Sequence, residues 1–338
     1  MIKNLKRNIS LKPYNTFAIE AKAKYFTDVF SISQLKNALQ FAKENNFQFK
    51  IISGGSNVLF VEQEYEFIIH ILIGGIEKTF ENEYEIHYKV GAGVKWHTFV
   101  KYCVNKGLGG IENLSLIPGS VGASPMQNIG AYGVEIKDVF KSLTALEIST
   151  GQLKIFSLKD CKFGYRESIF KNELKNKFII IDVTYKLLKI PKFNISYGAL
   201  SGLLEKKELS VSTISDAVIS IRQSKLPDPS VIGNAGSFFK NPEVSNERFN
   251  KLKEKYPEIP SYNLDNGNVK IPAGWLIETC GWKGFRKNDA GCHKHQALVL
   301  VNYGSATGNE ILDLSDEIVS SVKQKFGIEL QKEVNILK

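Results

Sequence analysis

The stretch PGSVGASPMQNIGAYG, residues 118–133, holds four glycines, two alanines and two serines in sixteen positions. Glycine disfavours both helices and strands, so a chain does not collect small residues in this way in order to pack a core. The usual physical reason is that the backbone must come very close to something bulky. We therefore predict a loop whose backbone is a binding surface. The alternative is a buried Ω-loop whose polar groups are satisfied internally.

A second glycine-rich stretch, SGGSN at residues 53–57, lies within FKIISGGSNVLF (49–60). Successive backbone N–H groups in such a turn can form a concave nest for phosphate oxygens, although a tight hairpin explains the same residues. In the first loop, Gln127 and Asn128 offer donors and acceptors that suit a flavin ring edge or a ribose, and Tyr132 offers a flat face. Together the two loops predict one elongated, phosphate-bearing ligand, such as a dinucleotide. The chain has neither G-x-G-x-x-G nor G-x-x-x-x-G-K-[ST], so neither a Rossmann fold nor a P-loop is supported.

The composition is that of an ordinary globular protein, because 43% of the 338 residues are hydrophobic and 23% are charged. The length allows two or three domains. There is no apolar run of about 18 residues and no apolar segment behind the basic N-terminus, so we expect neither a membrane span nor a secretory signal. The cysteines are too sparse for a disulfide framework, which favours a reducing cytoplasm: Cys103, Cys161, Cys280 and Cys292.

The net charge of +9 is spread over scattered lysines that alternate with acidic residues and asparagines. We therefore expect no nucleic-acid partner, whereas a diffuse positive field suits a small anionic substrate. A non-catalytic nucleotide- or RNA-binding protein remains the alternative from a different class, and it would bind nucleic acid with a strong salt dependence. Only five arginines stand against 39 lysines, which makes each arginine worth inspecting.

Hydrophobic periodicity and capping residues predict an α+β fold, because helices and strands occur without regular β-α-β alternation. One predicted helix places Trp96, Phe99, Val100, Cys103 and Val104 on a single face, so Cys103 is expected in the core. The strands 142–149 and 153–158 read as a hairpin turned at Thr150–Gly151. The predicted helices are 31–46, 94–107, 213–225, 272–281 and 307–327, and the other predicted strands are 47–52, 67–73, 84–90, 177–188, 297–302 and 328–337.

Three residues outside the loops are candidates for chemistry. Arg166, in FGYRESIFK (163–171), could stabilise an anion or could simply pair with Glu167. Ser237, in GNAGSFFKNP (233–242), lacks a nucleophile motif but could donate a proton from a turn. Glu333 lies opposite the apolar face of the last predicted strand. The cluster CHKH (292–295) does not have zinc-site spacing, so we expect no metal.

The order of NTF (15–17), SGGSN, IPGSVGASPMQNIGAYG, YRESIFK, GNAGSFFKNP, PAGWLIE and KEV closely resembles the UDP-N-acetylenolpyruvoylglucosamine reductase (MurB) family. The insertion between 188 and 225 resembles its type I form. The resemblance implies an FAD-binding fold shared with vanillyl-alcohol oxidases. It also implies an FAD-binding region at 1–190 (subdomains about 1–70 and 71–190), the insertion and a connecting helix at 191–225, and a substrate-binding domain at 226–338 whose last strand returns to the active site.

The resemblance also implies that FAD, bound non-covalently, lies against both loops. A flavoprotein oxidase of the same fold is the nearest rival, but such enzymes often attach flavin through His or Cys, and His97 and Cys103 lie on a helix instead. Ser124 departs from the family, where alanine is more usual. The implied FAD contacts are Ser53, Gly54, Gly55, Ser56, Asn57, Pro118, Gly119, Ser120, Gly122, Ala123, Gln127, Asn128, Gly130 and Ala131.

The family reaction reduces UDP-N-acetylglucosamine enolpyruvate to UDP-N-acetylmuramate with NADPH, in peptidoglycan precursor synthesis. The resemblance assigns Arg166 to charge stabilisation, Ser237 to proton donation and Glu333 to the acidic partner. Tyr197 lies in the insertion, which is expected to fold over the substrate as a lid. We expect a cytoplasmic monomer. The implied contacts to the UDP diphosphate are Tyr197, Lys225, Lys240 and Asn241, with Gln296 nearby.

Overall fold

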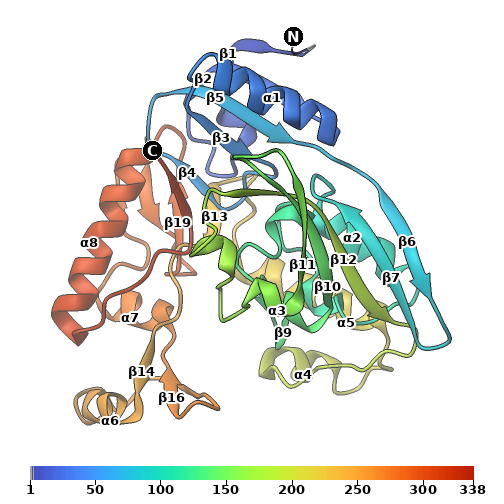
Figure 1. Cartoon of the computed structure of the whole chain (residues 1–338). Coiled ribbons are helices and arrows are strands. Elements are labelled where there is room, and N and C mark those ends of the chain that lie inside the picture. Colours follow the sequence, from blue (N-terminus) through green and yellow to red (C-terminus); the bar gives the residue numbers. More distant parts are fainter. Residues whose placement is uncertain (1, 3) are drawn as a thin grey trace. The chain divides into compact units, whose positions relative to one another are not determined.

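The computed structural model describes residues 2 and 4–338, and the chain divides into two compact units. Unit 1 runs up to Ile9 and includes Lys22–Gly55 and Glu64–Ser224. Unit 2 consists of Ser10–Ala21, Ser56–Gln63 and Lys225–Lys338. Figure 1 traces the elements of both units in chain order. The mixture of helices and strands confirms the α+β prediction.

Unit 1 contains a four-stranded sheet in the order β1(Lys6–Ser10)-β2(Lys22–Val29)-β5(Glu64–Ile71)-β3(Phe49–Ile52), in which β2 and β3 both run parallel to β5. Helix α1(Ile32–Glu44) packs Leu35, Ala38 and Ala42 into the same apolar cluster as Phe67 and Ile69 of β5. The predicted helix is confirmed, and Ser31 caps it by accepting a hydrogen bond from the Gln34 N–H.

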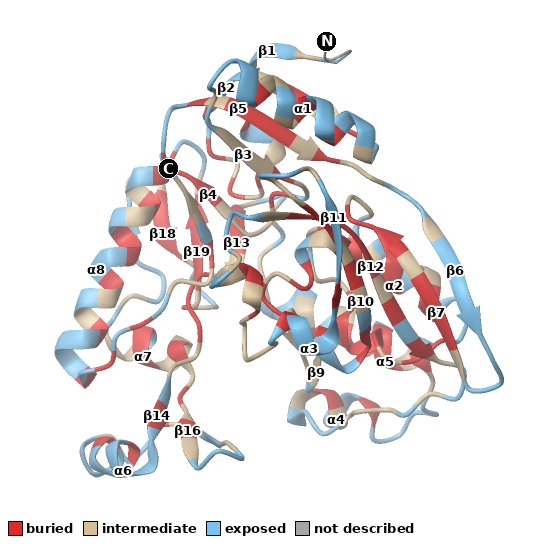
Figure 2. Cartoon of the chain, viewed as in Figure 1, coloured by how far each residue is buried: buried red, intermediate tan, exposed pale blue. Residues whose placement is uncertain are grey.

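The second sheet of unit 1 is antiparallel, in the order β11(Leu153–Ser157)-β10(Phe140–Glu147)-β12(Phe178–Leu188)-β7(Glu85–Gly91)-β6(Ile76–Glu81). Helix α2(Trp96–Val104) buries the predicted face, and burial raises the pKa of the Cys103 thiol. Figure 2 shows buried residues along β5 and β12. The other elements of this unit are β8(Gly130–Ala131), β9(Val134–Glu135), α3(Leu158–Cys161), α4(Gly198–Leu204) and α5(Val211–Lys225).

Unit 2 has a sheet in the order β13(Gly233–Ser237)-β19(Val299–Asn302)-β18(Ala290–Cys292)-β17(Arg286–Lys287). Helix α8(Gly308–Phe326) begins at a capping box formed by Thr307 and Glu310, and Gly327 ends it in a left-handed conformation. The remaining elements are the sheet β14(Glu243–Ser245)-β16(Asn268–Lys270)-β15(Tyr262–Asn263) and the helices α6(Asn246–Lys255) and α7(Ala273–Thr279).

The reading of residues 49–60 as a tight hairpin is wrong. Strand β3 pairs with β5, whereas β4(Val58–Phe60) pairs in parallel with β20(Asn335–Leu337), at the other end of the chain. The predicted last strand is also shorter than expected, since only 335–337 form regular pairs, with one further bridge between Lys332 and Phe239. No helix among residues 2 and 4–338 is both long enough and apolar enough to cross a membrane.

Candidate functional site

The two glycine-rich loops meet backbone to backbone within unit 1. A Cβ atom added at Gly54 would lie 2.7 Å from the Cα of Gly119 and 3.3 Å from the amide nitrogen of Ser120. Gly55 and Gly119 have φ angles of 60° and 103°, which side chains disfavour. Glycine is therefore required here by both the close approach and the backbone conformation.

The loop at 118–133 is held by backbone hydrogen bonds to the segment between β7 and α2. The Gly122 N–H donates to the Ala92 carbonyl at 2.9 Å, and the Val121 N–H donates to the Val94 carbonyl at 2.9 Å. The hydroxyl of Ser120 is buried beside this contact and has no hydrogen-bond partner among residues 2 and 4–338. A buried hydroxyl without a partner is costly. Its position in a cradle of small residues therefore fits a ligand that supplies a polar atom.

The side chain of Asn128 forms its hydrogen bonds with other residues of the chain. Its side-chain amide donates to Glu135 Oε2 and to the Gly164 carbonyl, each at 3.0 Å, and its Oδ1 accepts from the Lys137 N–H at 3.0 Å. These bonds fix the loop at a residue with φ of 44°. Asn128 thus shapes the loop.

Ser124, the departure from the family pattern, has a buried partner, because its hydroxyl lies 2.7 Å from that of Tyr185. Both side chains are buried. The extra hydroxyl is therefore accommodated within the core of unit 1.

Arg166 extends toward the end of the same loop. Its Nη2 donates to the Gly130 carbonyl at 2.6 Å, and its guanidinium lies 5.4 Å from the centre of the Tyr165 ring. Its φ of 54° is a conformation that non-glycine residues rarely adopt. The guanidinium is thus positioned beside Gly130, one of the expected FAD contacts.

In unit 2, the backbone brings Ser237 and Glu333 close together. Ser237 ends β13, and the carbonyl of the next residue, Phe238, accepts a hydrogen bond from the Glu333 N–H at 2.8 Å. The Lys240 N–H donates to the Gln331 carbonyl at 2.9 Å, so the two segments pair side by side. Asn57 Nδ2 donates to the Glu333 carbonyl at 3.3 Å, which fastens this segment to the residue before β4.

The residues expected to contact the diphosphate differ in exposure. Lys240 is buried, Tyr197 is 41% exposed, and Lys225 is exposed at the end of α5. Asn241 Oδ1 accepts from the Ala273 N–H at 2.9 Å, at the start of α7. The side-chain oxygen of Gln296 faces the same helix, 3.4 Å from where a Cβ of Gly274 would lie.

Sequence reasoning did not single out Arg222, whose side chain in α5 hydrogen-bonds the hydroxyl of Tyr132 and interacts electrostatically with Arg166. The only signal that pointed to it was the rarity of arginine in the chain.

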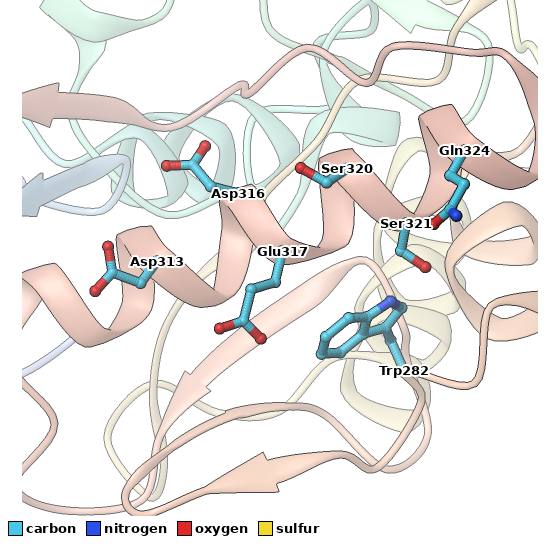
Figure 3. A pocket seen from close by; sticks show the side chains of 7 residues that line it. All are labelled: Trp282, Asp313, Asp316, Glu317, Ser320, Ser321 and Gln324. Atoms are coloured by element: carbon cyan, nitrogen blue, oxygen red, sulfur yellow. The ribbon is translucent and has the colours of Figure 1, made fainter.

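An open hollow on unit 2 contains none of the predicted site residues (Figure 3). It lies along α8, and two of its carboxylates are paired: Asp316 with Lys332 at 2.5 Å, and Glu317 with Lys287 at 3.3 Å. The residues that line it are Trp282, Asp313, Asp316, Glu317, Ser320, Ser321 and Gln324.

Known proteins with the same fold define the class of protein to which this chain belongs. Residues 24–157 match the model of an FAD binding domain. The structure of UDP-N-acetylenolpyruvylglucosamine reductase (MurB) from Thermus caldophilus superposes with a TM-score of 0.68 at 22% identity, and the match covers 99% of this chain and 100% of that one. A solvent-stable cholesterol oxidase matches in fold with a TM-score of 0.50 at 12% identity, over 96% of this chain and 86% of that one. The chain therefore has the fold of an FAD-binding protein.

The family follows from closer relatives. Residues 228–337 match the C-terminal domain of UDP-N-acetylenolpyruvoylglucosamine reductase. Proteins of that name from Amoebophilus asiaticus and Flavobacterium johnsoniae are each 51% identical, over 99% and 98% of this chain and 99% of their own lengths. The chain belongs to the UDP-N-acetylenolpyruvoylglucosamine reductase family, which confirms the resemblance drawn from its motifs.

Proposed function

We propose that this chain reduces UDP-N-acetylglucosamine enolpyruvate to UDP-N-acetylmuramate, with NADPH as the reductant and FAD as the bound cofactor, in the synthesis of peptidoglycan precursors. Family membership over almost the whole chain supports this activity. The observation that carries the cofactor assignment is the Gly54–Gly119 approach beside the unpartnered Ser120 hydroxyl.

The cradle of unit 1 fits FAD, because small residues and backbone N–H groups suit a pyrophosphate that must lie against the chain itself. Ser53, Gly54, Gly55 and the residues from Pro118 to Ala131 would hold it there. Ser53 also donates through its hydroxyl to the Ile71 carbonyl at 3.0 Å, which fixes the turn. When bound, FAD would supply the two-electron redox chemistry that links NADPH to reduction of the enolpyruvyl group at its β-carbon.

Arg166 stabilises the negative charge that develops on the α-carbon and carboxylate of the substrate. A preorganised cation in a dry site can lower such a barrier by several kcal/mol. The hydrogen bond to the Gly130 carbonyl holds the guanidinium in one orientation, so little reorganisation is needed during the reaction.

Ser237 donates the proton that the α-carbon must receive once the β-carbon has gained hydride. A hydroxyl is a weak acid, so donation requires a strongly basic carbanion next to it and a second group that steers the proton. Glu333 has that steering role. The pairing of the segment at 331–333 with 238–240 supports the assignment, since it sets the backbones of Ser237 and Glu333 beside one another.

The UDP diphosphate is bound by Tyr197, Lys225, Lys240 and Asn241, with Gln296 nearby, and each lysine acts as a point charge on phosphate. Tyr197 covers the substrate from the segment before α4, and its 41% exposure is consistent with a side chain that closes on a ligand. We also propose that the active form is a monomer. The free state of all four cysteines supports a reducing, cytoplasmic location.

The Ser237→Ala variant tests this assignment by separating the two half-reactions. We expect bleaching of the flavin absorbance by NADPH at the wild-type rate, and recovery by the enolpyruvyl substrate slowed by about 100-fold or more, as for loss of a general acid. Stopped-flow absorbance under anaerobic conditions measures both rates. Ser320→Ala, an exposed serine on α8, is the matched control and should change neither. Equal slowing of both half-reactions in Ser237→Ala would contradict the proton-donor role.

A further inference from the structure

Two asparagines of unit 1 join the insertion to the loop at 118–133. Asn113 is buried, and its Nδ2 donates to the carbonyls of Tyr132 and Asn194, each at 2.8 Å. Asn194 in turn donates from its own Nδ2 to the carbonyl of Gly133 at 2.9 Å. Gly133 leaves room for this contact, because an added Cβ would lie 2.9 Å from the same nitrogen. The insertion is therefore attached to the loop through both side chains.

The two acceptors beside Asn113 require an amide rather than a carboxylate. Both acceptors are carbonyl oxygens, so one side-chain nitrogen must supply two N–H donors. Turning the amide over would place its Oδ1 against both carbonyls, which fixes the orientation of the side chain. The remaining Oδ1 is buried and has no hydrogen-bond partner among residues 2 and 4–338. Since such an oxygen is unfavourable, its presence indicates that the two donated bonds matter.

The helical turn that carries Asn113 is fixed in the core of unit 1. The buried carboxylate of Glu112 accepts a hydrogen bond from the Gly110 N–H at 2.6 Å. On the other side, the indole N–H of Trp96 donates to the Leu114 carbonyl at 2.9 Å. Because both neighbours of Asn113 are held in this way, its side chain is a fixed point to which the insertion attaches.

Asn194 extends the attachment toward Tyr197. Its Oδ1 accepts from the N–H and from the hydroxyl of Ser196, at 3.2 and 2.8 Å, which closes a turn directly before Tyr197. The ring of Tyr197 packs edge-on against that of Tyr132, with centroids 5.2 Å apart. Tyr132 is also a residue whose carbonyl Asn113 holds. The segment before Tyr197 and the ring it packs against are thus secured by the same two asparagines.

We propose that Asn194, held by Asn113, is a positioning residue that sets the ring of Tyr197 for contact with the nucleotide sugar. This inference rests on the proposed function, in which Tyr197 contacts the UDP diphosphate. Ordering a mobile side chain during binding lowers affinity, and holding its segment in place beforehand removes part of that cost. Asn194 acts on binding only through Tyr197 and does not itself touch the substrate or the cofactor.

The test is a double-mutant cycle between Asn194 and Tyr197. Calorimetric titration of oxidised, FAD-loaded protein with UDP-N-acetylmuramate gives a dissociation constant for the wild type, Asn194→Ala, Tyr197→Ala and the double variant. Asn82→Ala is the matched control, because Asn82 Oδ1 also closes a turn in unit 1, by accepting from the N–H groups of Tyr84 and Glu85 at 2.8 Å. The FAD content and the melting temperature of each variant are measured before titration.

We expect Asn194→Ala to weaken the binding of UDP-N-acetylmuramate about 5-fold, as for the loss of hydrogen bonds between neutral groups, and Asn82→Ala to leave it unchanged. Adding Asn194→Ala to Tyr197→Ala should weaken binding no further, because no ring is left to position. Asn194→Asp keeps an acceptor for Ser196 but cannot donate to the Gly133 carbonyl, so it should weaken binding at least as much as Asn194→Ala.

Three results would overturn the proposal. Equal weakening by Asn194→Ala with and without the Tyr197 ring would mean that Asn194 affects binding by another route. Wild-type affinity in Asn194→Asp would show that the bond to Gly133 positions nothing. A reduced FAD content or a large fall in the melting temperature of Asn194→Ala would make Asn194 a structural support. Failure of the wild type to bind UDP-N-acetylmuramate, or wild-type affinity in Tyr197→Ala, would instead overturn the proposed function or its lid, and this inference with it.

Discussion

Gly54 has no side chain at the point where residues 53–55 approach the loop at 118–133. The atoms it would meet are backbone atoms of Gly119 and Ser120, which cannot move aside as the end of a flexible side chain can. The same contact explains the small residues at positions 119 and 120 of the loop. At this scale, local composition correctly indicated a close backbone approach, although it could not show which atoms meet.

We expect Gly54→Ala to displace one loop from the other and so reduce FAD binding. The added methyl would sit 2.7 Å from the Gly119 Cα, where real contacts are not found. The flavin-to-protein absorbance ratio of the purified variant should fall well below that of the wild type. Gly202→Ala, in α4, is the control because nothing lies within 4 Å of its added methyl. Full FAD content in Gly54→Ala would mean that the cofactor does not depend on this contact.

Arg222 marks a limit of residue-level reasoning. Its neighbours Tyr132 and Arg166 are 90 and 56 residues away in the sequence, so no local pattern joins them. Arg166, Ser237 and Glu333 were likewise ordinary residues until the family resemblance gave them roles. Isolated polar side chains acquire a function from distant parts of the chain, which a single sequence does not display.

At the scale of elements, the helices were predictable because their signals are local. Helices α1 and α8 have apolar residues at helical spacing and end at recognisable caps. Strand pairing was not predictable, because strands that pair can lie far apart in the sequence. Strand β4, near residue 60, pairs with β20, at the C-terminal end of the chain. The alternative of a tight hairpin at 49–60 stayed open from sequence alone for this reason, because a turn between two apolar runs does not reveal that each run pairs elsewhere.

The start of α8 depends on one glycine. A Cβ at Gly308 would clash with the carbonyl oxygen of Phe60, so the helix begins directly against β4. We expect Gly308→Ala to lower the free energy of unfolding by about 3 kcal/mol or more, since backbone on both sides must shift. Chemical denaturation measures the change.

Ser320→Ala serves as the control on the same helix, where an exposed position should tolerate alanine within about 0.5 kcal/mol. A wild-type midpoint for Gly308→Ala would show that α8 can move away from β4 without cost. Substrate turnover should fall in parallel with stability, because β4 pairs with β20, which directly follows the Glu333 segment.

At the scale of the whole molecule, the residues proposed for catalysis belong to both units. Arg166 comes from unit 1, and Ser237 and Glu333 come from unit 2. The division also assigns Ser10–Ala21 and Ser56–Gln63 to the unit formed mainly by the C-terminal part of the chain. The boundary between the units passes through the SGGSN stretch itself.

The central claim is that this chain binds FAD and passes reducing equivalents from NADPH to the enolpyruvyl nucleotide sugar. The most direct test is the visible absorption spectrum of the purified protein, recorded anaerobically before and after NADPH and again after the substrate. We predict a flavin spectrum that bleaches with NADPH and recovers with the substrate, in step with formation of UDP-N-acetylmuramate. A flavin that recovers only with oxygen, or a colourless protein that cannot be reconstituted with FAD, would contradict the account.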